Sequence, residues 1–553
     1  MSEVSDTKTS GTSLISSINQ SGSGIDLSNL VDGLVTAETF SKQESLTEKV
    51  EATNLQISSY GQLNTKLDTL SSSLSTLEST TARTTASSST AVSLTVTNEA
   101  IAKDINADIT VSSVAQGQVV TFDLTHSSLL NSNTLSSSSS IDTGSIAFVM
   151  NGATTTITIG SSNNTLQGLV DEINKISGAQ ASLIDTTGSG GLSLSIKSDT
   201  GTANAFSLTS SDGLNEFNTS GMSSSSTPIK LSVASSNAVF TVDGLSVTRS
   251  SNLVSDLFSG QTLNINAVSA SPVNVESAVV TSNATVKMQS FVESINSLKT
   301  YLTAETKRGL NGGTAGSLAG DFAAQSVLSE LRSITTQEIT GYGSSSFYLA
   351  NVGIKTERDG TLSLDTAKFE AAIAADPDLV NIVFSSKYSS TSDKVAVTGS
   401  ANYPPVAGSY SFNFTASSGA GSLNSEALSG ATNSSGNKVF RGTTGDANGM
   451  AVEVLNATAD ISGTVRFGQS IIDKLQVYIK DIKSSTGILS KRNTSLNENL
   501  AKYEIEQTEL DEKIQSLTDQ YNVKFGKMES LVTQLNKTGE YLTSMMDAWN
   551  KKD

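Results

Sequence analysis

Two long apolar seams with heptad spacing, one toward each end of the chain, constrain its fold more than any other feature. In both seams the apolar side chains recur at steps of three and four residues, which is typical of helices that pack in a coiled coil. The first seam runs from Leu46 and includes Ile57, Tyr60, Leu63, Leu67, Leu70, Leu74 and Leu77. The second seam comprises Leu496, Leu500, Tyr503, Leu510, Ile514, Leu517 and Tyr521. Ordinary bundle helices are the alternative, but these seams exceed the ~11–12 residues of the mean globular helix.

Each seam is flanked, on the side of its chain end, by a further apolar stripe. In "GSGIDLSNLVDGLVTAE" (22–38), Asp26 can cap a helix whose one face carries Leu27, Leu30, Val31, Leu34 and Val35. Beyond the second seam lie further apolar side chains, namely Leu531, Val532, Leu535, Tyr541, Leu542 and Met545. The neighbouring segments are too polar or too short to fold alone, so we expect other chains to complete both ends.

Between the seams the apolar period changes from helical to two, which is typical of half-buried strands. Three dipeptides, Asn151-Gly152, Asp243-Gly244 and Asp359-Gly360, stand between strand-like runs and predict hairpins. The segment 165–176 predicts one amphipathic helix within the first β region, and the helical period returns after about residue 281. Residues 388–467 are again strand-like and rich in glycine.

This alternation predicts an α+β multidomain fold, in which a terminal α-helical coiled-coil stalk carries inserted antiparallel β-rich head domains. We expect a flexible N-terminal segment with an amphipathic helix over 1–45 and a flexible C-terminal segment over 526–553. The predicted helical stalk comprises 46–81, 281–387 and 468–525. One β head domain is expected over 82–140 and 232–280, a second, distal α+β head over 141–231, and an additional β insert over 388–467.

Composition excludes several classes of partner. The 553 residues carry 35 basic and 53 acidic side chains, a net charge of −18, which disfavours nucleic acid and anionic membranes. The chain has no cysteine, so it can form neither a disulfide nor a thiolate metal site. A Sec-type signal is not expected, because the N-terminal residues lack a basic region followed by an apolar one. No apolar run is long enough for membrane insertion.

We find no catalytic or cofactor-binding motif in the sequence, and we expect a protein that is not an enzyme and has no cofactor. His126 is the only histidine and stands in a strand-to-loop transition, where an exposed loop residue is the simplest interpretation. An EF-hand aligned on Gly360 would place Lys355 at the first ligand position and Thr366 at the bidentate glutamate position, so calcium is excluded. The glycine-rich stretch 309–321 lacks the Lys-Ser/Thr pair of a phosphate loop.

Several segments resemble the bacterial flagellar filament-capping family, flagellar hook-associated protein 2. The resemblance begins with "GSGIDLSNLVDGLVTAE" and continues with "TLQGLVDEINKISGAQASLIDTTGSGGLSLSIKSDTGTANAFSLT" (165–209). It extends to "GIKTERDGTLSLDTAKFEAAIAADPDLVNIVF" (353–384) and to "KMESLVTQLNKTGEYLTSMM" (527–546). The extension before residue 22 and the insert at 388–467 depart from the family pattern.

The resemblance implies a homo-oligomeric ring at the distal tip of the extracellular flagellar filament, where flagellin is placed beneath a plate of β heads. It implies flagellin and the hook–filament junction protein as partners, and export through the flagellar type III apparatus. It also implies a cytoplasmic chaperone that holds the C-terminal helix before export. Some members of the family contact mucus or host glycans through the head.

Within this framework we expect the Leu27–Val35 stripe to pack against the C-terminal stripe around Leu531, Leu535 and Leu542. We expect Leu510 to face the first coil around Leu63–Leu70. Two rival functions remain open from the sequence. A secreted adhesin or fibre protein would share the Ser/Thr-rich β heads, and a β-modular glycan hydrolase would need a paired-carboxylate cleft.

Overall fold

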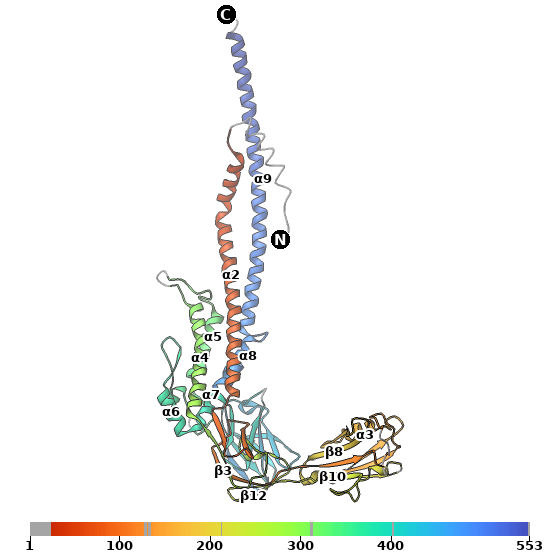
Figure 1. The fold of residues 1–553 in the computed structure, drawn as a ribbon. Coiled ribbons are helices and arrows are strands. Elements are labelled where there is room, and N and C mark those ends of the chain that lie inside the picture. Colours follow the sequence, from red (N-terminus) through yellow and green to blue (C-terminus); the bar gives the residue numbers. More distant parts are fainter. Residues whose placement is uncertain are drawn as a thin grey trace.

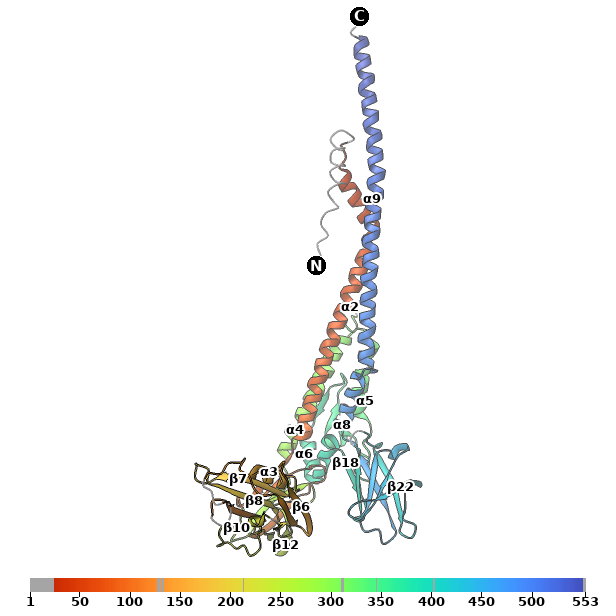
Figure 2. The same cartoon turned by 90° about the vertical axis from the view of Figure 1, so that its right-hand side faces the viewer.

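The molecule is a long helical stalk with β domains gathered at one end (Figure 1). The structure is a computed structural model that describes residues 24–126, 130, 134–211, 213–309, 313–344, 346–400 and 403–550. Figure 2 shows that the β domains lie on two sides of the stalk base, with the heads on one side and the insert on the other. The predicted α+β architecture, with a terminal helical stalk and inserted antiparallel β domains, is confirmed.

Two helices, α2 (Leu27–Ser79) and α9 (Ile488–Asn550), form the length of the stalk. The N-terminus of α2 is capped as predicted, because the Asn29 N–H donates to Asp26 Oδ1 at 3.2 Å. The expected division between a flexible N-terminal segment and a coil from residue 46 is wrong within the described residues, since α2 runs unbroken from Leu27. The expected flexible segment from residue 526 is likewise helical as far as Asn550, because it contains no proline and good helix formers outnumber its Gly526 and Gly539.

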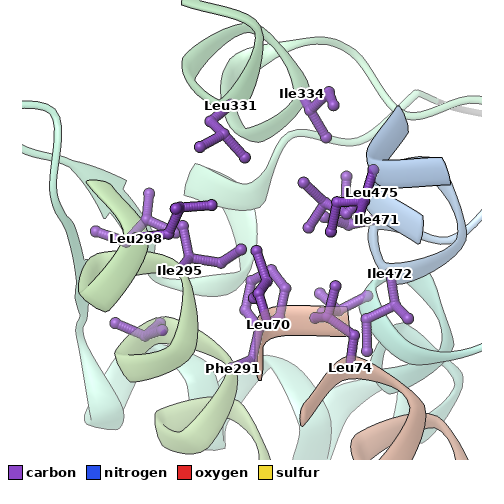
Figure 3. Packing of buried hydrophobic residues seen from close by; sticks show 14 of the residues in the cluster. Leu70, Leu74, Phe291, Ile295, Leu298, Leu331, Ile334, Ile471, Ile472 and Leu475 are labelled. Atoms are coloured by element: carbon purple, nitrogen blue, oxygen red, sulfur yellow. The ribbon is translucent and has the colours of Figure 1, made fainter. Parts of the chain in front are cut away.

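At the base of the stalk α2 packs into a helical bundle rather than against α9 alone. The bundle helices are α4 (Thr281–Thr306), α5 (Phe322–Thr336), α6 (Thr366–Ala375), α7 (Asn381–Phe384) and α8 (Ile471–Lys483). Figure 3 shows Leu70 and Leu74 of α2 among Phe291, Ile295 and Leu475, which come from α4 and α8. As the sequence predicts, β16 (Ile354–Thr356) and β17 (Leu362–Leu364) form a small hairpin whose turn contains Gly360. This hairpin packs on α4 through β17.

The proximal head consists of two sheets with a common core that includes Ile109, Phe240 and Val275. Its five-stranded sheet has the order β1 (Arg83–Ser87), β15 (Val273–Val279), β3 (Ile105–Ser113), β11 (Ala238–Val242), β12 (Leu245–Arg249). Its three-stranded sheet has the order β13 (Leu253–Phe258), β14 (Gln261–Ile265), β2 (Val92–Val96). The predicted Asp243-Gly244 turn joins β11 to β12 with φ angles of 50° and 85°, which a type I′ turn requires.

The distal head contains the predicted amphipathic helix, α3 (Leu166–Ile173), and two further sheets. The first sheet has the order β10 (Ile229–Val233), β4 (Gly117–Asp123), β8 (Leu192–Thr200), β7 (Ala179–Asp185), and the second has the order β6 (Ala153–Ile159), β5 (Gly144–Met150), β9 (Phe206–Ser211). The expected boundary at residue 141 is wrong, because β4 pairs with β8 and buries Val120 and Phe122 in the distal core. Alternation shows that a segment is a strand but not which sheet it joins.

The insert is one eight-stranded antiparallel sheet with its own aromatic core. Its order is β18 (Lys387–Ser390), β25 (Ile461–Gly468), β20 (Gly408–Thr415), β21 (Ala420–Leu423), β22 (Glu426–Thr432), β23 (Lys438–Arg441), β24 (Met450–Val454), β19 (Val395–Gly399). The core contains Phe412, Phe414 and Phe440, with Phe440 packed directly against Gly421 and Gly430. The absence of a side chain at these two glycines therefore gives the aromatic ring its space.

A buried polar cluster joins three stalk helices at the level where α2 leaves the bundle. The Tyr60 hydroxyl donates to Asp321 Oδ1 at 2.5 Å, and Arg492 Nε donates to Asp321 Oδ2 at 2.7 Å. Asp321 also caps α5 through the backbone N–H groups of Ala323 and Ala324. Burial alone would raise the pKa of Asp321, but the hydrogen bonds from Tyr60 and Arg492 outweigh it and lower this pKa.

We predict that Asp321→Asn destabilises the full-length protein by about 2–4 kcal/mol, because Arg492 loses its carboxylate partner in a largely buried site. The lowered pKa means that the carboxylate stabilises the fold above its unfolded-state value, roughly 4, and that this contribution is lost as the pH falls through the native value. Urea unfolding measured by circular dichroism between pH 3 and 7 tests both statements.

Glu44→Gln is the matched control, since Glu44 lies exposed on α2. The variant Asp321→Asn should show a smaller loss of stability on acidification than the wild type and the control. Equal stabilities at pH 7 for all three proteins would refute the structural role of the cluster.

Candidate assembly interface

The predicted N-terminal seam is buried along almost its whole length. Leu27, Val31 and Val35 are at most 5 % exposed, and Tyr60, Leu63, Leu67, Leu70, Leu74 and Leu77 are buried as well. Ile57 is partly buried and packs at the edge of the bundle core. Leu30 and Leu34 are each 37 % exposed, so the stripe is wider than the surface that α9 covers.

Polar contacts fix an antiparallel register between α2 and α9. The Tyr521 hydroxyl donates to Glu38 Oε2 at 3.4 Å, and Lys513 Nζ forms an ion pair with Glu38 Oε1 at 3.9 Å. The Lys49 ammonium lies 5.8 Å from the centre of the Tyr503 ring. Lower down the stalk, Lys483 of α8 donates to Asp68 of α2. As the residue numbers rise along α2, those of the facing helix therefore fall.

This register corrects the expected position of Leu510. Leu510 is buried, as predicted, but it lies between Tyr503 and Lys513 and hence opposite the stretch of α2 between Glu38 and Lys49. The expected partners Leu63–Leu70 lie roughly 30 Å further down the stalk at 1.5 Å per residue. They pack instead in the bundle core with α4 and α8. The heptad pattern identified the buried face but could not fix which part of the partner faces it.

The C-terminal seam is less buried than the N-terminal one. Within the described part of α9, Leu496 and Leu510 are almost fully buried. Leu500, Tyr503, Ile514, Leu517 and Tyr521 are partly buried, and Ile505 is 60 % exposed beside them. A pair of helices leaves one side of each seam open, so this part of the stalk retains apolar surface for further packing.

The last two dozen residues of α9 extend beyond the start of α2, over roughly 36 Å. The predicted tail residues Leu531, Leu535, Tyr541, Leu542 and Met545 are 51–65 % exposed, and Val532 is partly buried. Met528, which the sequence places in the same stripe, is 40 % exposed, and Met546 and Trp549, which sequence analysis missed, belong to the same exposed set. We call this surface, Met528 to Trp549, the C-terminal overhang.

The expected pairing of the Leu27–Val35 stripe with Leu531, Leu535 and Leu542 is therefore wrong. Glu38 lies opposite the 513–521 region, so Leu27 lies opposite about residue 526, below the overhang. The Leu27–Val35 stripe packs against α9 of the same chain, below the overhang. The overhang continues beyond the start of α2 as an amphipathic helix that no described helix faces (Figures 1 and 2).

Other polar clusters in the described residues have structural partners. A crevice of about 320 Å³ between stalk and proximal head is lined by Glu78, Glu99 and Asp473. Glu99 binds Lys287 at 3.2 Å, and Asp473 accepts a hydrogen bond from Ser386. Burial and the charge of Asp473 raise the pKa of Glu78.

We also searched the described residues for metal-binding groups and for membrane-spanning helices. Within the described ranges, no group of three or more His, Asp or Glu side chains could hold a metal ion. None of the helices that the structure describes is long and apolar enough to cross a bilayer.

These features define a class of protein, namely an elongated assembly protein with β heads at one end of a coiled-coil stalk and an apolar helix at the other. Family comparison identifies it further. The model described as "Flagellar hook-associated protein 2 C-terminus" matches residues 235–537, and "Flagellar hook-associated protein 2 N-terminus" matches residues 23–118. The chain belongs to the flagellar hook-associated protein 2 family.

Individual relatives agree with this assignment. The B-type flagellar hook-associated protein 2 of Pseudomonas aeruginosa is 30% identical over 384 residues, covering 64% of this chain and 77% of the relative. Flagellar hook-associated protein 2 of Escherichia coli K12 is 29% identical over 381 residues with the same coverage. The crystal structure of the D1–D2–D3 domains of the flagellar cap protein FliD from Escherichia coli is 25% identical, with a TM-score of 0.51. It covers 79% of this chain and 99% of its own.

We predict opposite effects for the same charge placed at two positions of α9. Leu510→Asp should destabilise the upper stalk by about 3–5 kcal/mol, because Leu510 is only 1 % exposed and a carboxylate in its place would lose its hydration. Leu531→Asp should leave stability within about 0.5 kcal/mol, since Leu531 is 60 % exposed.

Hydrogen exchange along α2 and α9 measures the difference locally. Loss of protection in Leu510→Asp should centre on residues 38–49, whereas loss centred on 63–70 would overturn the register. A stability change in Leu531→Asp as large as in Leu510→Asp would show that the overhang is covered within the chain.

Proposed function

We propose that this protein caps the distal tip of the bacterial flagellar filament, promotes ordered polymerisation of flagellin and prevents the loss of flagellin monomers. The observation that carries this proposal is the polarity of the molecule. The β domains gather at one end of the stalk, and the exposed apolar overhang lies at the other (Figure 1). Membership of the family, and similarity to a protein whose crystal structure is described as a flagellar cap, support it.

In the proposed assembly several copies form a homo-oligomeric ring outside the cell, with parallel stalks. The heads form a plate, and the overhangs point into the filament, where flagellin and the hook–filament junction protein offer helical partners. A fully buried Leu or Met contributes about 1.5–3 kcal/mol, so the seven or eight exposed side chains of the overhang could drive this docking. We also propose functional units that follow the cores, with a stalk, a proximal head, a distal head from about residue 117 to 233, and the insert.

The rival functions have less support. A secreted adhesin needs β heads but no apolar overhang 36 Å long, although the distal head could still contact mucus or host glycans. A glycan hydrolase needs an acid and a nucleophile or base in an accessible cleft. In the crevice at the head–stalk junction, two of the three carboxylates are engaged by Lys287 and Ser386, which favours a structural role.

The cap function is tested by complementation of a strain that lacks the chromosomal gene. The wild-type protein should restore filaments and swimming, while a variant that ends at Lys527, just before the overhang, should leave flagellin monomers in the medium. Quantitative immunoblotting of the medium and electron microscopy of the cells measure this. Normal filaments with the truncated variant would contradict the proposed role of the overhang.

We further propose that a small helical chaperone covers the overhang in the cytoplasm before export. Exposed Leu, Met and Trp side chains along one helical face would otherwise promote premature association. The full-length protein should capture the chaperone in a pull-down, and the double variant Leu535→Ser/Leu542→Ser should capture at least about tenfold less. The matched control is Gln534→Ser, on an exposed polar position of the same helix. Equal capture by all three proteins would refute the proposal.

A further inference from the structure

The insert is firmly attached to the stalk rather than tethered by a linker. The partly buried Tyr342 ring packs against Gly468, where an added Cβ would lie 2.6 Å from the ring, and its hydroxyl is held by the Ser385 carbonyl of the stalk, to which it donates at 3.0 Å. Thr340 Oγ1 donates to the Ala407 carbonyl at 3.1 Å. Because Gly468 ends the last strand of the insert and Ala407 lies in its middle, these contacts restrict the orientation of the insert relative to the stalk.

A charged contact adds to this attachment and extends it to the head. Asp378 of the stalk accepts from Lys387 of the insert at 3.1 Å and from Lys103 of the proximal head at 2.7 Å. One side chain therefore joins the stalk, the insert and the head.

A continuous groove lies on the insert where it meets α8. Its two hollows have volumes of about 360 and 590 Å³ and share Gly399 and Ser400. The smaller hollow is walled by the stacked rings of Tyr388 and Phe467, 4.6 Å apart, and by Val477 of α8. Tyr403, which lines the larger hollow, and Val477, which lines the smaller one, are 74 % and 53 % exposed, and they give the groove apolar surface of the kind that proteins use for association.

The position of the insert indicates what faces this groove. Figure 2 shows the insert on one flank of the stalk base and the heads on the other flank, at the same end of the molecule. In a ring of copies with parallel stalks, a flank of one copy faces a different flank of the next copy, because such contacts are heterologous. Since the insert and the heads lie at the same end of the stalk, the insert of one copy can meet the head of the next copy.

Charge favours the same pairing. Residues 387–468 carry five basic and five acidic side chains and are neutral, whereas the heads, residues 82–280, carry six basic and fourteen acidic side chains. Direct contact between two heads would bring like charges together, and a neutral insert placed between them avoids this repulsion within a Debye length of about 8 Å. Arg441 at the rim of the larger hollow forms no ion pair among the described residues and is available to a head carboxylate.

We propose that the groove between the insert and α8 binds the head of an adjacent copy of this chain, so that the insert is the lateral contact that closes the ring. The proposal rests on the proposed cap function, which supplies the ring with parallel stalks. It assigns a role to the segment that departs from the family pattern, and it names Tyr403 and Val477 as the central contacts.

The test uses the full-length protein with a photo-crosslinking amino acid at Tyr403 or at Val477. Both should yield a covalent dimer of this chain, and mass spectrometry should locate the second site in residues 82–280. The matched control is the same amino acid at Ser435, in the exposed turn at the opposite end of β23 from the groove, which should yield no dimer. Crosslinking to flagellin during filament growth, crosslinking into another insert, or no dimer would each overturn the proposal.

A second measurement uses the double variant Tyr403→Ala/Val477→Ser, which changes two exposed side chains and leaves the cores intact. Its dissociation constant for self-association, measured by analytical ultracentrifugation, should rise at least about tenfold. An unchanged constant would overturn the proposal, while wild-type protein that fails to restore filaments in the deletion strain would overturn the cap function instead. The two failures are therefore distinguishable.

Discussion

The structure depends on the burial of one seam, Leu63 to Leu77 of α2, in a core built from segments more than two hundred residues apart. This seam packs against Phe291 and Ile295 of α4 and against Ile471 and Leu475 of α8, and all are almost completely excluded from water. Each such side chain contributes about 1.5–3 kcal/mol on burial, so the bundle is stable enough to anchor three inserted β domains. Because the head and insert segments leave and re-enter this bundle, its packing sets where every β domain lies.

The polar contacts near this core act on geometry more than on total stability. Asp321 joins α2, α5 and α9 at the level where the bundle gives way to the helix pair. Asp378 joins the stalk to both the proximal head and the insert. Ion pairs that are partly buried gain little net free energy, but their geometry restricts how packed bodies can rotate. In the cap proposed above, such restriction would keep the heads at a fixed angle to the stalks.

The apolar surface of the stalk grows from base to tip. The bundle is closed, the α2–α9 pair leaves residues such as Ile505 exposed, and the overhang is open on one whole face. This gradient follows from the number of helices at each level, because each additional helix covers another part of an apolar stripe. A surface that the chain leaves open in this ordered way is available for assembly, which connects the fold to the proposed interaction with flagellin and with other copies.

The sequence by itself determined the elements and their class. Heptad spacing identified the two long helices and the side chains that α2 buries, and the Asn151-Gly152 and Asp243-Gly244 pairs identified two hairpins, because both signals are local. Only the tertiary structure decided what each face meets. Leu510 lies opposite Glu38–Lys49 rather than Leu63–Leu70, β4 belongs to the distal head, and the insert packs on Tyr342 through Gly468. A periodic pattern repeats along the whole helix, so it is satisfied by many registers. The choice among them is made by contacts such as Lys513 with Glu38 and Lys483 with Asp68, whose partners lie more than four hundred residues apart in the chain.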